Sequence, residues 1–475
     1  MGEIGSGAGS SFPATLDTDN TKENTATSAR PDVPNDLADC IIKIQTALGT
    51  SPQGNYSDTK TRLNNTNSPF SLVIAPSGYP LAQNANYVCD GISDEDTILT
   101  AINALPAGVG GRISLREGVY LFHAELVKDS FDSVIIEGCG KATKIQRGFE
   151  SASAKGLFDI TNCNNWVFRN MWIDGQSATY ISTNNRGINI GIGCTDSIVD
   201  GVVFSDMPAE ALYINPHATT DTSQRGKVTN CFFSNVNKGI YLYRAKDISI
   251  IGNSVASLVA SGNGIYLTGD SNNNIIIGNV IRNATAGAVA MYLSNASRNV
   301  IIGNEILDDS GGNIGINIRG NCDSNIVAGN FIRDFDKNIY CEGSGSEDNF
   351  IALNYLRKGT AIYVTDAGNK PYCVYNYIQS GTISDSNKVG HFLNYNNNIA
   401  PATITVGASA YNYQNTNPYP LDVIVNSGTV SLIEFSKDGS TYYTTGLTAG
   451  IFRVHTYDSL RTTYTVAPSM VAVAR

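Results

Sequence analysis

The sequence lacks several features that mark common functional classes. Its first twenty residues hold no basic segment followed by an apolar one, and no run of about 18 apolar residues occurs, so we expect neither a signal peptide nor a membrane span. Lysine and arginine number 32 against 42 aspartates and glutamates, a net charge of -10. Nucleic-acid binding needs a basic face. We therefore expect no nucleic-acid or membrane partner, and an extracellular role would require release by lysis or within a particle.

Metal and cofactor motifs are also missing. The nine cysteines form no Cys-x-x-Cys pair and no Cys/His spacing typical of zinc, and the Gly-rich calcium nonapeptide is absent. Because nine is an odd number, a fully disulfide-bonded framework is disfavoured. We predict no metal and no cofactor, with the cysteines acting as small buried residues in a protein made in a reducing cytoplasm.

What the sequence does contain is a repeat that ends in asparagine. Its members are Asn253, Asn279, Asn304, Asn330, Asn354 and Asn376, at steps of 26, 25, 26, 24 and 22 residues. β-Branched residues with Gly/Asn turns at such a period indicate a β-solenoid, one repeat per coil. Looser spacing extends the repeat back to Gly118 and gives about eleven coils. We predict that Gly and Asn adopt left-handed turn conformations and that the asparagine side chains bond from coil to coil, as does a second column, Asn274, Asn299, Asn325 and Asn349.

An amphipathic helix is predicted over Asp94–Ala104, with Ile98 and Ile102 on one stripe and Pro106 ending it. Together with residues 86–91 and 118–120, this segment resembles the beginning of pectate-lyase-like right-handed β-helices, where a helix covers the first coil. The expected fold class is therefore all-β: a right-handed parallel β-helix of about eleven coils, an N-terminal capping helix and a small C-terminal β-sandwich.

Three regions are predicted. Residues 1–70 form a flexible arm and a short helix over 34–48 for attachment or oligomerisation, residues 71–400 the β-helix, and residues 401–475, with short alternating strands, the β-sandwich. Residues 49–58 resemble a linker phrase of tailed-phage structural proteins. This resemblance implies a virion surface protein of tail-spike or fibre type that contacts other virion proteins through its N-terminal region, and fold analogy adds a homotrimer.

A column of outward-facing residues is predicted on the strand before the asparagine repeat, because the aliphatic residues on either side of each point inward. Its members are Tyr213, Tyr241, Tyr266, Tyr292, Asn317, Tyr340 and Tyr363. With Arg319 nearby, the tyrosines are candidates for polysaccharide binding, since amphipathic rings stack on sugars and their hydroxyls bond to sugar hydroxyls. Alternatively, the tyrosines pair between rungs and stabilise the sheet by about 0.2–1 kcal/mol per pair.

Candidate catalytic residues lie beside this column: Asn215, His217, Tyr243 and Arg244. An arginine that neutralises a uronate, beside His or Tyr as a proton carrier, suits a polysaccharide lyase or C-5 epimerase. Residues 214–217 resemble part of the mannuronan C-5 epimerase motif Tyr-Gly-Phe-Asp-Pro-His, although Leu212 and Asn215 stand where that family has Tyr and Asp. His217 is alternatively a surface residue after a proline turn.

A hydrolase would need two carboxylates about 5–9 Å apart, and Glu342 with Asp366 on adjacent rungs is the candidate pair. The sequence thus leaves three functions open: a virion-surface β-helix that binds, and cleaves or modifies, a host or acidic polysaccharide; a free lyase or epimerase on an acidic polysaccharide; or a structural decoration. It does not decide whether the protein is an enzyme.

Overall fold

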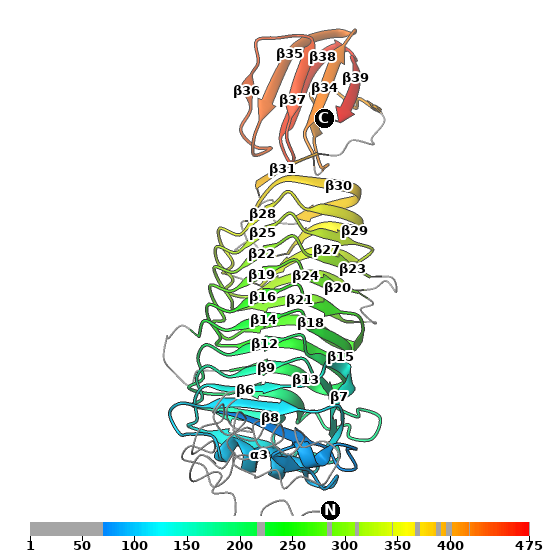
Figure 1. Cartoon of the computed structure of the whole chain (residues 1–475). Coiled ribbons are helices and arrows are strands. Elements are labelled where there is room, and N and C mark those ends of the chain that lie inside the picture. The colour runs from blue at the N-terminus through cyan, green and yellow to red at the C-terminus, as the bar shows by residue number, and fades with distance from the viewer. Residues whose placement is uncertain are drawn as a thin grey trace, which may run out of the picture. The chain divides into compact units, whose positions relative to one another are not determined.

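The structure, a computed structural model, describes residues 70–215, 224–282, 287–308, 313–343, 345–365, 371–385, 391–395, 401–417 and 419–474 (Figure 1). The chain divides into two compact units, residues 1–71 and 72–475. The predicted arm and the helix over 34–48 lie outside the described residues. Among the residues that the structure describes, no helix is long and apolar enough to cross a membrane.

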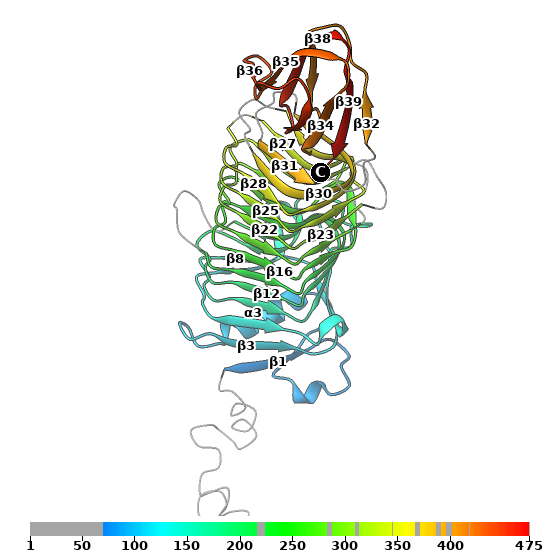
Figure 2. The same ribbon diagram turned by 90° about the horizontal axis from the view of Figure 1, so that it is seen from above.

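Parallel strands stack rung upon rung in three ladders, and consecutive rungs lie side by side in both views (Figure 1, Figure 2). The first ladder, which carries the asparagine repeat, contains β1 (Ser71–Ala75), β3 (Gly111–Leu115), β6 (Val134–Glu137), β9 (Val167–Arg169), β12 (Ile198–Asp200), β14 (Lys227–Thr229), β16 (Ser249–Ile251), β19 (Ile275–Ile277), β22 (Val300–Ile302), β25 (Ile326–Ala328), β28 (Phe350–Ala352), β30 (Tyr372–Asp385) and β31 (His391–Tyr395). The short β2 (Tyr87–Val88) pairs with β1.

The second ladder contains β4 (Gly118–Phe122), β7 (Thr143–Arg147), β10 (Trp172–Asp174), β13 (Val203–Ile214), β15 (Phe232–Tyr243), β17 (Ser254–Val255), β20 (Val280–Ile281), β23 (Glu305–Leu307), β26 (Phe331–Arg333) and β29 (Tyr355–Val364), and ends on β30. The third contains β5 (Leu126–Asp129), β8 (Lys155–Thr161), β11 (Asn185–Ile190), β13, β15, β18 (Leu258–Thr268), β21 (Val289–Ser294), β24 (Ile314–Arg319), β27 (Lys337–Glu342), β29 and β30. The predicted parallel β-helix of about eleven coils is confirmed.

Period-two alternation explains why these strands form. In β15, Ile240 and Leu242 are fully buried while Tyr241 between them is half-buried, and the same pattern recurs around Tyr266, Tyr292, Tyr340 and Tyr363. The inward residues form one continuous apolar core along the β-helix. The outward residues of the third ladder are thereby fixed in register, because a slip of one residue would turn the aliphatic side chains to solvent.

The asparagine repeat forms a buried hydrogen-bonded ladder, as predicted. Each Nδ2 donates to the Oδ1 of the next coil, for example Asn279 to Asn304 at 3.0 Å and Asn304 to Asn330 at 2.9 Å. The second column, represented by Asn299 and Asn325, does the same at 3.1 Å. These amides bond the turns of successive coils together where the backbone alone leaves donors and acceptors unpaired.

In the six regular coils the left-handed residue of each turn is the one before the asparagine, which corrects the prediction for these asparagines. In earlier coils Asn170 and Asn230 do adopt this conformation, at φ 53° and 54°, as predicted. Glycines immediately before the asparagine of the regular coils have φ values of 61° to 66°, as at Gly303 (65°). In the last two coils the position is held by Leu353 and Tyr375, at φ 55° and 54°. A side chain in this region is strained, so these two coils adopt the turn at a cost.

The N-terminal end of the β-helix carries α3 (Asp94–Asn103), which confirms the predicted capping helix. Its residues Ile98, Ala101 and Ile102 are fully buried in the core of the β-helix. Asp94 accepts hydrogen bonds from the backbone N–H groups of Gly91 and Leu121, both at 2.8 Å, and so ties the helix to β4. Two short 3-10 helices, η1 (Ala82–Asn84) and η2 (Gly140–Ala142), complete this part of the chain.

Two antiparallel four-stranded sheets follow in the sequence and confirm the predicted small β-sandwich. One contains β32 (Ala402–Ile404), β39 (Ser469–Ala474), β34 (Leu421–Asn426) and β37 (Gly450–Val454), and the other β33 (Tyr411–Gln414), β38 (Ser459–Val466), β35 (Thr429–Ser436) and β36 (Tyr443–Thr444). Their shared core includes Val423, Ile433, Val454, Leu460 and Met470.

Candidate functional site

The outward residues of the third ladder form one in-register column. Tyr213, Tyr241, Tyr266 and Tyr292 pair in succession, Asn317 pairs with Tyr292, and Tyr340 and Tyr363 follow. We call these seven residues the tyrosine column. Each tyrosine is positioned by two buried apolar neighbours on its own strand, so the rigid core holds the phenol groups at the ~4.8 Å spacing of the rungs.

Within the column the rings stack on one another. Ring centroids of Tyr241 and Tyr266 lie 4.7 Å apart, and those of Tyr266 and Tyr292 4.8 Å apart, with interplanar angles of 6° in both pairs. Tyr340 and Tyr363 stack at 5.1 Å. The ring faces therefore meet other rings, and polar side chains lie at the hydroxyl-bearing edges: Arg319 donates to the Tyr292 hydroxyl at 3.1 Å, and Thr268 and Thr365 lie within hydrogen-bonding reach of the hydroxyls of Tyr266 and Tyr340. This is the pairing between rungs that the sequence left open as an alternative, and it restricts sugar stacking to ring faces that lack a tyrosine neighbour.

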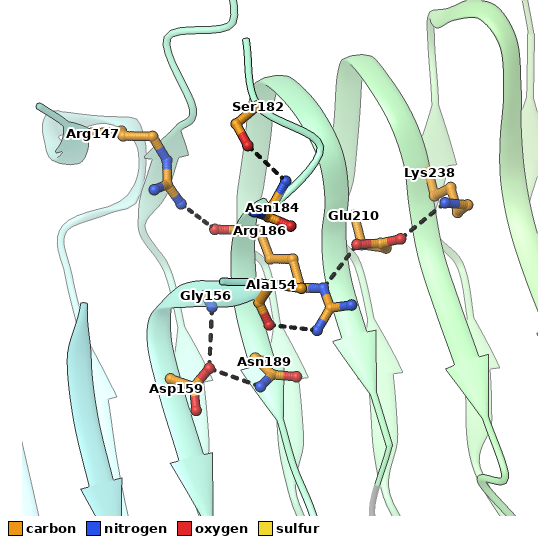
Figure 3. A network of polar contacts seen from close by, with 10 residues as sticks. All are labelled: Arg147, Ala154, Gly156, Asp159, Ser182, Asn184, Arg186, Asn189, Glu210 and Lys238. Carbon is orange, nitrogen blue, oxygen red and sulfur yellow. Dashed lines mark hydrogen bonds and ion pairs between the residues drawn. The ribbon is translucent and has the colours of Figure 1, made fainter. Parts of the chain in front are cut away.

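A charged group flanks the start of the column (Figure 3). Arg186 Nε donates to Glu210 Oε2 at 2.8 Å, and Lys238 Nζ donates to Glu210 Oε1 at 2.9 Å. The Arg186 guanidinium lies 3.9 Å from the centroid of the Tyr213 ring, and Lys238 Nζ lies 5.3 Å from that of Tyr241. Burial alone would raise the pKa of Glu210, but the two cations outweigh it and lower that pKa, so the carboxylate stays ionised.

Asp159, Asn189 and Arg147 continue this group toward the N-terminal end (Figure 3). Asp159 precedes Asn189 in the register of the column, and its Oδ2 accepts from Asn189 Nδ2 at 2.8 Å. Arg147 is fully buried and donates to the carbonyl oxygen of Arg186, which fixes the backbone below the Glu210 pair. Burial lowers the pKa of Arg147 to about 10.

At Asn317 the aromatic column is interrupted. Asn317 is 4% exposed, and its Nδ2 donates to Glu342 Oε1 at 2.9 Å. Arg319 Nη1 donates to the Tyr292 hydroxyl at 3.1 Å, while its Nε lies 3.9 Å from Glu342 Oε1. Burial raises the pKa of Tyr340, with the nearby Glu342 acting in the same direction. Arg319 and Glu342 therefore lie together at the interruption, as neighbours in the next outward column.

The predicted catalytic residues are placed only in part. Asn215 lies within hydrogen-bonding reach of the Tyr213 hydroxyl. The Arg244 guanidinium carbon lies 5.1 Å from the centroid of the Tyr243 ring. The Tyr243 ring also packs against Gly269, where a Cβ atom would lie only 2.8 Å from a ring carbon. His217 and Asp366 lie outside the described residues, so the roles predicted for them stay predictions. Among the described residues, no group of three or more His, Cys, Asp or Glu side chains could hold a metal ion.

Sequence reasoning missed the charged group of Arg186, Glu210 and Lys238. A signal was present: Glu210, Lys238 and Lys337 each stand three residues before a column tyrosine, and Arg186 stands three before Asn189. Two consecutive buried residues separate each charged residue from the column residue, at a corner of the coil. Because two inward residues follow one another there, strict alternation fails, and the charged side chain lies on the outer face although alternation would place it inside.

Comparison with known proteins gives one family model. Residues 177–387 match the model described as periplasmic copper-binding protein (NosD), which spans less than half of this chain. A search of curated protein sequences found no significant match.

Solved structures with a similar chain path include carbohydrate-active proteins. The A-module of mannuronan C-5 epimerase AlgE6 from Azotobacter vinelandii has 16% identity and a TM-score of 0.47, over 64% of this chain and 94% of that one. A GH136 lacto-N-biosidase from Eubacterium ramulus has 12% identity and a TM-score of 0.48, over 77% and 74%. The tailspike protein gp49 of Acinetobacter baumannii bacteriophage Fri1, a capsular polysaccharide depolymerase, has 12% identity and a TM-score of 0.43, over 85% of both chains.

Proposed function

We propose that this chain is a carbohydrate-binding β-helix protein and that the tyrosine column is its binding surface. The observation that carries the proposal is the in-register row of stacked phenol groups on the outward face of the third ladder. Stacking between rungs uses the ring faces, so a change that removes only the hydroxyls separates carbohydrate binding from the packing of the rings.

The repeat of this surface suits a repeating ligand. One hydroxyl recurs at each rung from Tyr213 to Tyr292, and again at Tyr340 and Tyr363, about every 4.8 Å, which is close to the length of one sugar in an extended polysaccharide chain. A phenol hydroxyl donates and accepts one hydrogen bond each, so a row of them suits a chain of sugar hydroxyls lying along the rungs. Lys238, Arg319 and Lys337 beside the row add donors for oxygen-rich or anionic sugars.

The proposal is tested by removing hydroxyls without removing rings. The variant Tyr241→Phe/Tyr266→Phe/Tyr292→Phe retains the stack, and binding is measured by affinity electrophoresis and calorimetry on a panel of alginate, polygalacturonate, hyaluronan, capsular polysaccharide and dextran. We expect wild type to bind at least one member and the variant to bind it at least tenfold more weakly, with an unchanged melting temperature.

A matched control uses tyrosines stacked elsewhere on the β-helix. Tyr355 and Tyr377 stack at 5.3 Å on the second ladder, so Tyr355→Phe/Tyr377→Phe removes hydroxyls of the same kind away from the column. This control should bind like wild type. Equal binding by the column variant, or no binding of wild type to any member of the panel, would refute the proposal.

Within this role we propose attachment to a virion through residues 1–70, as a tail-spike or fibre-type protein and as a homotrimer. The support is the phrase in residues 49–58 that resembles phage structural proteins. Sedimentation velocity at micromolar concentration should give the mass of three chains, whereas a monomer would count against the trimer.

Modification of the bound polysaccharide is a second candidate function. It is favoured by Tyr243 and Arg244, which lie beside the column with Asn215 within reach of the Tyr213 hydroxyl. A lyase acting on alginate or polygalacturonate would produce an unsaturated uronate with ultraviolet absorbance, and an epimerase would change the uronate NMR spectrum. If neither signal changes, catalysis on these two uronates is excluded.

A further inference from the structure

Most ring faces in the tyrosine column are covered. The Arg186 guanidinium lies over Tyr213, and Tyr241 and Tyr266 have a tyrosine on each side. Tyr292 is stacked only on its Tyr266 side, and Tyr340 only on its Tyr363 side. Two of the remaining faces, those of Tyr292 and Tyr340, point toward the same rung, that of Asn317, which pairs with both tyrosines, while Tyr363 pairs on its other side with Ser384. We call this rung the Asn317 gap.

Lysine 337 does not fill the gap. Lys337 Nζ lies 4.0 Å from the centroid of Tyr340 and 4.9 Å from that of Tyr363, and these two centroids are 5.1 Å apart. An ammonium group on the Asn317 side of Tyr340 would be much farther from Tyr363. The ammonium therefore lies beside this pair of rings, and the face of Tyr340 toward Asn317 has no cation over it.

Asn317 itself has unused hydrogen-bonding capacity. Its Nδ2 donates to Glu342, but its Oδ1 is buried and accepts no hydrogen bond. A buried acceptor without a donor is unfavourable, and such groups in native proteins usually serve a ligand or a solvent molecule. Asparagine is also shorter than tyrosine, so the outer part of this rung is not filled by the side chain of the column.

Arginine 319 lies at the rim of the same gap. Its side chain is 59% exposed, and one Nη1 donates to the Tyr292 hydroxyl. The guanidinium group carries five N–H donors, so most of them remain for an oxygen-bearing ligand. Around one rung the structure therefore places two aromatic faces, a cationic donor and an acceptor that lacks a donor. Because Asn317 is 4% exposed, this acceptor becomes accessible only when the side chains that cover it move.

We propose that one pyranose ring of the bound polysaccharide occupies the Asn317 gap. The sugar lies between the rings of Tyr292 and Tyr340, in the place that a tyrosine takes on the other rungs. When the side chains that cover Asn317 move aside, a hydroxyl or N-acetyl N–H of the sugar donates to Asn317 Oδ1, and a ring, hydroxyl or carboxylate oxygen accepts from Arg319. The two tyrosines are two rungs, or about 9.6 Å, apart, which leaves the thickness of one ring between their faces. This assignment rests on the proposed function and names the sugar-stacking position within it.

The variant Asn317→Tyr tests the assignment, because it completes the column and closes the gap. Two new ring pairs would form, so the melting temperature should be equal to or above that of wild type. Binding of the panel polysaccharide that wild type binds most tightly should weaken at least tenfold, about 1.4 kcal/mol. Asn412→Tyr, on exposed β33 of the β-sandwich, is the control for adding a tyrosine and should bind like wild type.

A second variant covers the case in which Asn317→Tyr does not fold. Asn317→Ala leaves both ring faces in place and removes only the amide. Binding should therefore weaken by a smaller factor, about threefold to tenfold, which corresponds to the net free energy of one hydrogen bond. Where Asn317→Tyr folds, saturation-transfer NMR should show weaker transfer from protein aromatic protons to the C–H protons of the sugar than in wild type.

The outcomes separate this inference from the proposed function. Wild-type binding that Asn317→Tyr, or in its absence Asn317→Ala, retains in full would overturn the assignment of the gap and leave the tyrosine column as the binding surface. If wild type binds no panel member, the proposed function fails and the assignment falls with it. Weakened binding with an unchanged or higher melting temperature supports both.

Discussion

Replacing Asn304 by leucine should destabilise the β-helix strongly while leaving glycan binding unchanged. Asn304 is 1% exposed, and its Oδ1 accepts from both the backbone N–H and the Nδ2 of Asn279, at 2.9 and 3.0 Å. Its Nδ2 donates to the Ile276 carbonyl at 3.0 Å and to Asn330 Oδ1 at 2.9 Å. Leucine supplies none of these bonds to the coils above and below.

The expected loss of unfolding free energy follows from the groups that lose a hydrogen-bond partner. The buried backbone N–H of Asn279 is left without an acceptor, which costs about 1–3 kcal/mol, and the other lost bonds cost about 1 kcal/mol each net. Forcing a branched side chain into a column of amides adds about 1–3 kcal/mol, partly offset by the burial of apolar surface. We expect the free energy of unfolding to fall by about 4 kcal/mol.

The assay is urea denaturation followed by far-ultraviolet circular dichroism, with unchanged m-values as the sign that the same surface unfolds. Asn321→Leu is the matched control, because Asn321 is exposed on the same β-helix and should change the free energy of unfolding by less than about 0.5 kcal/mol. If Asn304→Leu is as stable as this control, the ladder does not hold the coils together. If it binds glycan with altered specificity at unchanged stability, the ladder has a role other than architecture.

Three further outcomes are expected. Leu353→Gly should raise the free energy of unfolding by about 1 kcal/mol by relieving the left-handed strain at φ 55°, and Gly303→Leu should lower it by about 1–2 kcal/mol; equal stability of both with wild type in thermal melts would remove the strain argument. Because its cationic partners lower the pKa of Glu210, the stability it contributes is present above its ordinary value of 4.5 and is lost as pH falls through the folded-state pKa; Glu210→Gln should therefore show a smaller loss of stability on acidification, and an identical pH profile would contradict this. Tyr266→Ala removes a ring stacked on two neighbours and should cost about 1–3 kcal/mol, whereas Tyr266→Phe should cost less than about 0.5 kcal/mol; equal losses would mean that the hydroxyl, not the stack, stabilises the sheet.

The fold was predictable because its signal repeats. The asparagine phrase returns in six consecutive coils, and each return independently supports the same period, so the ladders, the column of outward tyrosines and the capping helix all follow from the sequence. The left-handed position was less accessible, since Leu353 and Tyr375 occupy it without any residue type that marks it.

The site was predictable only in outline. Alternation places Tyr241 and Tyr266 outward, but it does not tell whether adjacent rings stack on each other or stand apart for a ligand, which depends on side-chain rotamers. The ion pairs of Glu210 and the buried position of Arg147 arise at corners of the coil, where strict alternation of inward and outward residues fails. The interruption at Asn317 was visible in the sequence, but its unpartnered Oδ1 becomes evident only in three dimensions.

The central claim is tested most directly by a crystal structure of the protein with an oligosaccharide of the panel polysaccharide that it binds most tightly. We expect sugar density along the tyrosine column, with hydroxyls of Tyr241, Tyr266 and Tyr292 in hydrogen-bonding distance and one pyranose ring between Tyr292 and Tyr340. Sugar bound on the first or second ladder, with the tyrosine column unoccupied, would contradict it.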